Sequence, residues 1–150
     1  MKKIKLVIGF TLFLAMASCA LQPIASEYTF IKTDLAKVEL DKLGDGNILI
    51  YNGATLMHKL DNTARLNIWI DNKALGQIRP TEYVIINVKK GQHHFKVVHV
   101  DVVNMKSEHD VNIDTDTKVI KIKPTVTSNK LEVTNEFPSN FEKLKYAQKR

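Results

Sequence analysis

The sequence predicts an all-β fold, a small antiparallel β-sandwich of about seven strands with a short C-terminal helix. The first observation is a series of short apolar, β-branched runs between residues 47 and 133, separated by glycine, proline, asparagine or aspartate. Short strands joined by such turn residues are typical of sandwiches and barrels. The second observation is a helix-capping pattern near the end of the 150-residue chain.

The best-patterned strand is predicted at 64–71. Leu66, Ile68 and Ile70 alternate there with Arg65, Asn67 and Trp69. Side chains alternate between the two faces of a strand, so this period of two predicts one buried face. The other runs predicted to form strands are 47–51, 74–78, 83–88, 93–103, 111–113, 119–122 and 130–133.

Turn residues separate these runs. Asp71-Asn72-Lys73 predicts a tight turn that makes a hairpin of the runs at 64–71 and 74–78. Gly91 follows two lysines and allows the positive φ that a turn there requires. Near the C-terminus, Ser139 and Glu142 form a Ser-x-x-Glu capping box, which predicts a short helix through Lys145 or beyond.

Residues 1–18 have the three-part layout of a secretory signal. Lys2, Lys3 and Lys5 precede an apolar run that ends near Met16, and small residues follow it. A membrane-spanning helix needs roughly 20 apolar residues, so this run is too short to be one. We therefore expect residues 1–18 to be a cleaved signal peptide, residues 19–41 a tether, and residues 42–150 a single folded domain.

The segment Met16-Ala17-Ser18-Cys19 resembles the lipobox of bacterial lipoproteins. That resemblance implies cleavage before Cys19 and attachment of diacylglycerol, with fatty acids such as palmitate, to its thiol. Cys19 is the only cysteine of the chain, so no disulfide is expected, and lipidation accounts for the odd thiol. Ala20 follows it, which in the Gram-negative pattern implies the outer membrane, with the domain facing the periplasm. An ordinary secreted protein and an uncleaved anchor are the alternatives.

The charge of the chain singles out no partner, and other features argue against nucleic acid. The formal net charge is +6, and three of the lysines belong to residues 1–18. The remaining charge is mildly basic, no run of basic residues is interleaved with aromatic ones, and an exported protein does not meet nucleic acid. A weakly basic surface favours anionic headgroups or other polyanions of the envelope.

No constellation of catalytic or metal-binding residues stands out. His93 and His99 lie roughly 20 Å apart if residues 93–103 form one strand, and His94 points to the opposite face. Across a hairpin His99 could approach His109. Ser107 is close in sequence to His109 and Asp110, but neighbours in a strand alternate faces, so their proximity does not make a triad. We therefore expect neither an enzyme, a metal site nor a cofactor, and read His93 as part of the turn after Gly91.

Three residues are candidates for an interaction site: Trp69, Tyr83 and His93. Trp69 alternates away from the buried positions of its strand, so it stands either exposed on the outer face, as an anchor for a partner, or covered by another part of the chain. Tyr83 and His93 are singled out by a resemblance.

The stretches NILIYN, IWIDNKALGQI, TEYVIINVKKGQHHF, VIKIKP and LEVTNEF resemble the bacterial lipoprotein family described as domain of unknown function 2846. Tyr83, Gly91 and His93 fall at the family's matching places. The stretch WIDNKALG also fits the hairpin of domains that join a short β-sandwich to surface layers. Either resemblance implies a small β-sandwich, and neither implies a catalytic residue.

The sequence thus predicts a lipid-anchored, non-catalytic accessory or interaction module of the cell envelope. Its expected partners are the membrane, through lipid on Cys19, and an envelope protein or the cell wall. The alternative is a small-ligand-binding or hydrolytic envelope protein whose site is assembled from distant loops.

Overall fold

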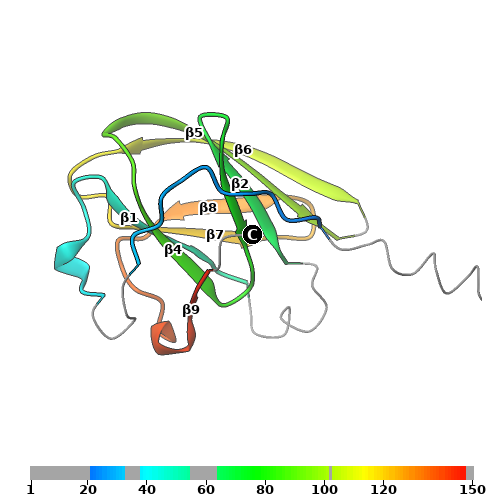
Figure 1. The fold of residues 1–150 in the computed structure, drawn as a ribbon. Helices are drawn as coiled ribbons and strands as arrows, with labels where there is room; N and C mark the ends of the chain where they lie inside the picture. The colour runs from blue at the N-terminus through cyan, green and yellow to red at the C-terminus, as the bar shows by residue number, and fades with distance from the viewer. Residues whose placement is uncertain (1–20, 33–37, 55–63, 102, 148–150) are drawn as a thin grey trace, which may run out of the picture.

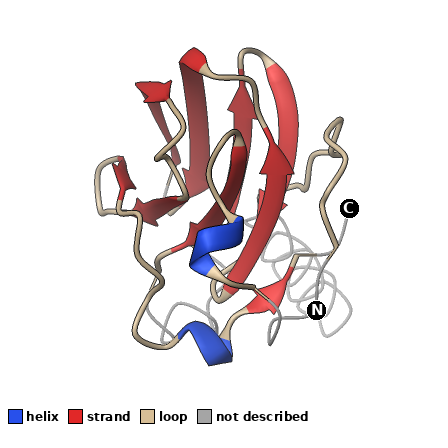
Figure 2. Ribbon diagram, turned by 90° about the vertical axis from the view of Figure 1, so that its left-hand side faces the viewer, coloured by secondary structure: helices blue, strands red, loops and turns tan. Residues whose placement is uncertain are grey.

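The architecture is all-β (Figure 1). The computed structural model describes residues 21–32, 38–54, 64–101 and 103–147, and its strands form two sheets. Within these ranges the helical segments are single 3₁₀ turns, η3 at Leu40–Lys42 and η5 at Phe141–Lys143, drawn as the short blue segments of Figure 2. No helix in the described part of the chain is long and apolar enough to cross a membrane.

The first sheet has five strands in the order β8-β7-β1-β4-β9. β1 pairs antiparallel with β4 but parallel with β7, and β9 pairs parallel with β4. The expectation of a purely antiparallel fold is therefore wrong at two pairings. The strands are β1 Asn47–Asn52, β4 Glu82–Asn87, β7 Val119–Pro124, β8 Asn129–Val133 and β9 Lys145–Tyr146.

The second sheet has four antiparallel strands in the order β3-β2-β5-β6. The predicted hairpin turn is confirmed, since Asp71 and Asn72 connect β2 to β3 with φ of 51° and 66°. Two consecutive positive φ values give the turn whose twist matches that of the strands. The strands are β2 Leu66–Ile70, β3 Lys73–Ile78, β5 Gly91–Val100 and β6 Asn104–Ile113.

The two sheets share one hydrophobic core. Alternate residues of their strands point inward, as the period of two requires, and most of these side chains are fully buried. Each such aliphatic side chain contributes about 1.5–3 kcal/mol when it is removed from water. The core includes Ile48, Ile50, Val84, Ile86, Ile120 and Ile122 from the five-stranded sheet, and Leu66, Ile68, Ile70, Phe95 and Val97 from the four-stranded sheet.

A second cluster covers the outer face of the five-stranded sheet. Leu49, Tyr83 and Ile85 are buried there, and segments before β1 and after β8 pack over them. β4 is therefore buried on both faces, which explains why its sequence is continuously apolar rather than alternating. The covering side chains come from Val38, Leu40, Leu43, Phe137, Phe141, Leu144 and Tyr146.

The predicted C-terminal helix is not formed. In its place the 3₁₀ turn η5 and the short strand β9 pack over the outer face of the five-stranded sheet. Asn140, not Ser139, precedes the 3₁₀ turn η5, and it makes no side-chain cap. The chain then extends, and Lys145 and Ala147 donate backbone hydrogen bonds to Thr81 and Tyr83 at the edge of β4. A local capping pattern is worth about 1 kcal/mol, and here pairing with β4 and burial of aromatic rings prevail over it.

Residues 21–32, which we call the strap, belong to the folded unit although they fall in the predicted tether. The strap is the blue segment of Figure 1 and has no regular structure of its own. At β3 the backbone N–H of Glu27 donates to the Ala74 carbonyl over 2.9 Å, and at β4 the Ile31 N–H donates to the Ile85 carbonyl over 2.8 Å. The strap thus joins β3, the edge strand of one sheet, to the part of β4 that lies beyond its short pairing with β9 in the other sheet.

Candidate functional site

The outer face of β2 and β5 carries the candidate Trp69. Its side chain is partly buried, and the Lys96 ammonium lies 4.8 Å from the centre of its ring. Lys96 is the residue opposite Trp69 in the β2–β5 pairing, so the contact follows directly from the register. A cation over the face of an indole is a favourable contact. Trp69 is therefore neither fully exposed nor covered by the other sheet, because Lys96 lies over its ring on the outer side.

A charged row continues from Lys96 across β6. Glu108 lies opposite Lys96 in register, and Asp110 lies opposite His94. The His94 Nδ1 is 2.8 Å from an Asp110 carboxylate oxygen, and its Nε2 is 3.6 Å from Glu108. The hydrogen bond with Asp110 is the main reason that the pKa of His94 is raised above its usual 6.5. These side chains are exposed, so solvent screens the pairs and they add little to stability.

His93 lies in β5, two residues after Gly91, and not in a turn as predicted, but its ring contacts the β2–β3 turn and the connection between β4 and β5. One ring nitrogen is 2.6 Å from an Asp71 carboxylate oxygen and the other is 2.6 Å from the Lys89 carbonyl. The second Asp71 oxygen accepts the backbone N–H of His94, and that bond is the main cause of the lowered pKa of Asp71. His93 and Asp71 together hold the β2–β3 turn against the beginning of β5.

Tyr83 lies inside the molecule rather than on its surface. Its side chain is 1% exposed, and its ring packs against Phe141 and Tyr146 at centroid distances of 5.8 and 5.6 Å. Tyr83 therefore supports the second cluster and offers no side-chain surface to a partner. Cys19 and the signal segment lie outside the described residues.

The two other histidines in the described part of the chain, His99 and His109, do not converge. His99 is buried and its Nδ1 contacts the Asn129 side chain, 2.8 Å away. The β5–β6 register places His99 opposite Met105 and His109 opposite Phe95, so His99 and His109 do not meet. Within residues 21–32, 38–54, 64–101 and 103–147, no three His, Cys, Asp or Glu side chains group as metal ligands would.

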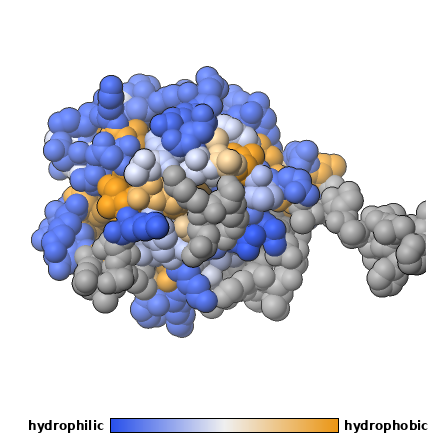
Figure 3. All heavy atoms as spheres, in the orientation of Figure 1, coloured by the Kyte–Doolittle hydropathy of each residue, from blue (hydrophilic) through white to orange (hydrophobic). Residues whose placement is uncertain are grey.

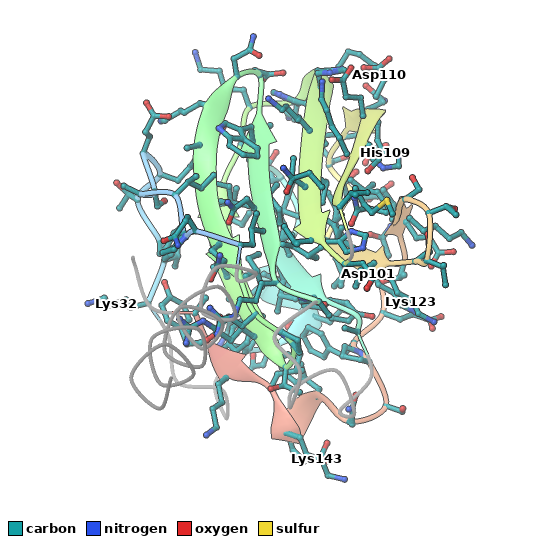
Figure 4. All side chains as sticks on the ribbon, turned by 90° about the vertical axis from the view of Figure 1, so that its right-hand side faces the viewer. Lys32, Asp101, His109, Asp110, Lys123 and Lys143 are labelled. Carbon is teal, nitrogen blue, oxygen red and sulfur yellow. The ribbon has the colours of Figure 1, made fainter. Side chains whose placement is uncertain are left out.

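Ser107 and His109 share one face of β6. The His109 Nε2 is 3.1 Å from the Ser107 hydroxyl. Asp110 points to the opposite face, where it contacts His94, and Figure 4 labels His109 and Asp110 as separate positions along the strand. A catalytic triad needs an acid that is hydrogen-bonded to its histidine. Asp110 does not contact His109, so it cannot serve the Ser107–His109 pair in this way.

A small hollow lies between η3 and the outer face of the five-stranded sheet. Its volume is about 160 Å³, and Ile31, Val38, Leu43 and Ile85 make up its apolar wall. A salt bridge of 2.9 Å joins Glu39 and Lys42 at its rim. Ligand pockets usually measure about 300–1,000 Å³, so this hollow is small for one.

Sequence reasoning missed the two buried amides that hold the beginning of the strap. Asn67 and Gln77 lie opposite each other in the β2–β3 pairing and are 3% and 4% exposed. Asn67 donates to the Gln22 carbonyl over 2.7 Å, and Gln77 donates to the Leu21 carbonyl over 3.1 Å. The available signal was that both are polar side chains on one sheet face, a pattern equally typical of solvent exposure.

The comparisons with known proteins identified no similar protein. No protein-family model matches the chain, and neither the curated proteins nor the solved structures that were searched contain a match.

Proposed function

We propose that the protein is an exported lipoprotein held on a bacterial membrane by lipid on Cys19, and that its domain is a non-catalytic β-sandwich module with an accessory or interaction role in the envelope. The observation that carries the proposal is the signal-like segment ending at the only cysteine of the chain. The strap supports it, because Leu21, two positions after the proposed anchor, is already hydrogen-bonded to Gln77 of the domain. The outer membrane and the resemblance to the lipoprotein family are part of the same proposal.

The partner of the module is an envelope protein or the cell wall, and the outer face of the four-stranded sheet is the surface we propose for it. Trp69, Lys96 and Glu108 lie there in one cross-strand row. An aromatic ring beside paired charges combines apolar area with polar specificity, as interaction sites commonly do. The alternative, a small-ligand-binding or hydrolytic protein, has less support because the hollow near Ile85 is small and Asp110 turns away from His109.

Lipidation is tested on Cys19 itself. The precursor and its Cys19→Ala variant are expressed in a bacterium with a labelled fatty acid, and the intact mass and membrane association of each product are measured. We expect the unchanged chain to lose residues 1–18 and gain label and lipid mass, because the thiol is the nucleophile that accepts the diacylglycerol. A Cys19→Ala product that still carried the label would disprove the assignment.

The interaction role is tested with Trp69→Ala, using Lys90→Ala as the control. Trp69 is partly buried on the proposed surface, whereas Lys90 is an exposed residue just before β5. Partners captured by crosslinking in intact cells, and the thermal midpoint of each variant, are compared with those of the unchanged protein. Loss of a partner with a nearly unchanged midpoint supports the surface, and capture that persists in Trp69→Ala rejects it.

A further inference from the structure

The beginning of the strap is fixed to one end of the four-stranded sheet. Gln77 holds the Leu21 carbonyl, Gln77 pairs with Asn67, and Asn67 pairs with Val98 of β5. Two residues further on, β5 ends at Val100 and turns into β6. In Figure 1 the strap and the β5–β6 turn accordingly reach the same, right-hand end of the molecule.

The turn between β7 and β8 lies at this end as well. Asn129, the first residue of β8, donates its amide hydrogens to the carbonyls of Val97 and Met105, over 3.3 and 3.2 Å. These residues flank the β5–β6 turn on its two strands. We call the surface formed by the described residues of the β5–β6 turn, which are 100, 101, 103 and 104, by the turn at 125–128 and by Leu21 the anchor end.

Exposed apolar side chains concentrate at the anchor end. Val126 is 79% exposed and Val103 is 58% exposed, the two highest values for large apolar side chains in the described part of the chain. Each stands in a turn, where a polar residue is usual. Figure 3 shows hydrophobic atoms at the same right-hand end, beside the place where the N-terminal trace leaves the domain.

Lysines stand on the strands that adjoin the turns of these two valines. Lys106 of β6 is 54% exposed, Lys130 of β8 is 66% exposed, and Lys123 lies opposite Lys130 in register. Figure 4, which views this end, labels Lys123 and also Asp101, the acidic residue of the β5–β6 turn. Lys106 and Lys130 pair with Glu108 and Glu132, so the positive charge at the tips is moderate rather than strong.

The chain leaves almost no slack between this end and Cys19. Only Ala20 separates Cys19 from Leu21. Two residue steps of an extended chain cover at most about 3.6 Å each, so the two α-carbons lie within about 7 Å of each other. A lipid on Cys19 therefore brings the anchor end to the headgroups, whichever way the side chain of Cys19 points.

We propose that the anchor end rests on the bilayer that holds the Cys19 lipid, with Val103 and Val126 among the headgroups and Lys106, Lys123 and Lys130 facing anionic phospholipid. The inference rests on the proposed lipidation and specifies which surface of the module the membrane covers. The turn at 114–117, at the far end of the β5–β6 hairpin, then points away from the membrane. Ten residues of β5 span about 30 Å.

The test uses the lipidated protein with one new cysteine at a time. Once Cys19 is acylated its sulfur no longer reacts with thiol reagents, so Val103→Cys, Val126→Cys and Asp116→Cys can each be labelled with an environment-sensitive fluorophore. The proteins are placed in vesicles of phosphatidylcholine with or without phosphatidylglycerol, and quenching by lipids brominated on their chains is measured. We expect quenching and a blue shift at positions 103 and 126 and neither at position 116.

The charge contribution is tested with a triple variant. Lys106→Glu, Lys123→Glu and Lys130→Glu together should abolish the extra quenching that phosphatidylglycerol produces, while Lys90→Glu at the far end should leave it unchanged. Equal quenching at positions 103 and 116, or none at either, in a protein whose intact mass shows the lipid would overturn the orientation alone. An unacylated product would overturn the lipid anchor, and the orientation with it.

Discussion

Asn129 is a single side chain that joins the two sheets. It is 3% exposed, donates to carbonyls on β5 and β6, and contacts the Nδ1 of buried His99. A buried polar group that loses its partner costs about 1–3 kcal/mol. Removing this amide deprives the Val97 and Met105 carbonyls and the His99 Nδ1 of a hydrogen-bond partner, at the place where the sheets meet.

We therefore expect Asn129→Ala to lower the free energy of unfolding by at least about 1–3 kcal/mol, measured by urea denaturation. Asn112→Ala is the control, because Asn112 is exposed on β6 and far along the strand. An Asn129→Ala protein as stable as the control would show that water replaces the amide without loss.

The pairing of His94 with Asp110 on the outer face of the four-stranded sheet makes the charge of His94 depend on its neighbours. The Asp110 carboxylate is the main cause of the raised pKa of His94, and Glu108 and Asp71 contribute less. We expect Asp110→Asn to lower the His94 pKa clearly and Glu108→Gln to lower it less, both measured by NMR titration of the imidazole. An equal fall in the two variants would contradict the dominance of the hydrogen bond.

The raised pKa of His94 also determines how the stability of the protein changes with pH. Because the folded-state pKa of His94 is raised, the protonated ring stabilises the fold fully below the ordinary value of 6.5, and this contribution is lost as pH rises through the folded-state pKa. The difference in thermal midpoint between the unchanged protein and Asp110→Asn should therefore shrink from acidic to alkaline pH. A difference that grew with pH would contradict the pairing.

The three candidate residues show how far residue-level reasoning reaches. The prediction of His93 in a turn is wrong, because β5 already begins at Gly91, and its contact with Asp71 joins residues 22 positions apart in the sequence. The outward direction of Trp69 was predictable from the period of two, but its contact with Lys96 depends on the β2–β5 register. Tyr83 is buried because segments distant in the sequence cover the second face of β4, and no local pattern reveals such cover.

Among the elements, β3 shows how the strap shapes its neighbour. Gly76 has φ of +113°, and a Cβ at this position would stand 3.3 Å from the Ser26 Cβ of the strap. The glycine therefore satisfies two demands, a backbone conformation that L-residues rarely adopt and a close approach of the strap.

We expect Gly76→Ala to destabilise the protein by about 1–3 kcal/mol from backbone strain, with an additional cost from contact with Ser26. Gly91→Ala is the matched control, because Gly91 has φ of +134° but nothing lies within 4 Å of its added Cβ. Hydrogen exchange of the Glu27 amide should accelerate in Gly76→Ala only. Equal exchange rates in the two variants would show that the strap is undisturbed.

Strands with a buried, apolar pattern were predictable from sequence, and those defined by long-range pairing were not. Most of β6 was missed because alternate positions carry Lys106, Glu108 and Asp110, and because polar Ser107 and His109 interrupt its inward face. Charged side chains on an edge strand discourage pairing with other chains, and they also hide the strand. β9 was mistaken for a helix because only its partner β4 makes it a strand.

At the scale of the whole molecule, the all-β class and the two-sheet arrangement follow from the patterned strands, but the mixed pairing does not. β1 lies parallel to β7, some 70 residues later in the chain, a distance over which local patterns carry no information. The strap was equally hidden, since its partners Asn67 and Gln77 lie 45 and 56 residues from the carbonyls they hold.

The strap predicts where a stable domain must begin. A chain starting at residue 42, the boundary that the sequence suggests, would uncover the β3 and β4 edges, and uncovered edges favour association between chains. We expect residues 42–150 to aggregate or to unfold at lower temperature than residues 21–150, measured by analytical ultracentrifugation and thermal denaturation. Two monomeric chains of equal midpoint would contradict a structural role for the strap.

The hydrogen bonds of Asn67 and Gln77 also have a mechanical meaning. In a chain anchored at Cys19, any tension between the bilayer and a bound partner enters the domain at Leu21 and Gln22, whose carbonyls these two amides hold. The load then divides between neighbouring strands instead of falling on one terminal residue. The two amides are thus the point at which such a tension acts on the domain. Their hydrogen bonds, and not the length of a tether, determine how far the domain can be pulled from the membrane before it begins to unfold.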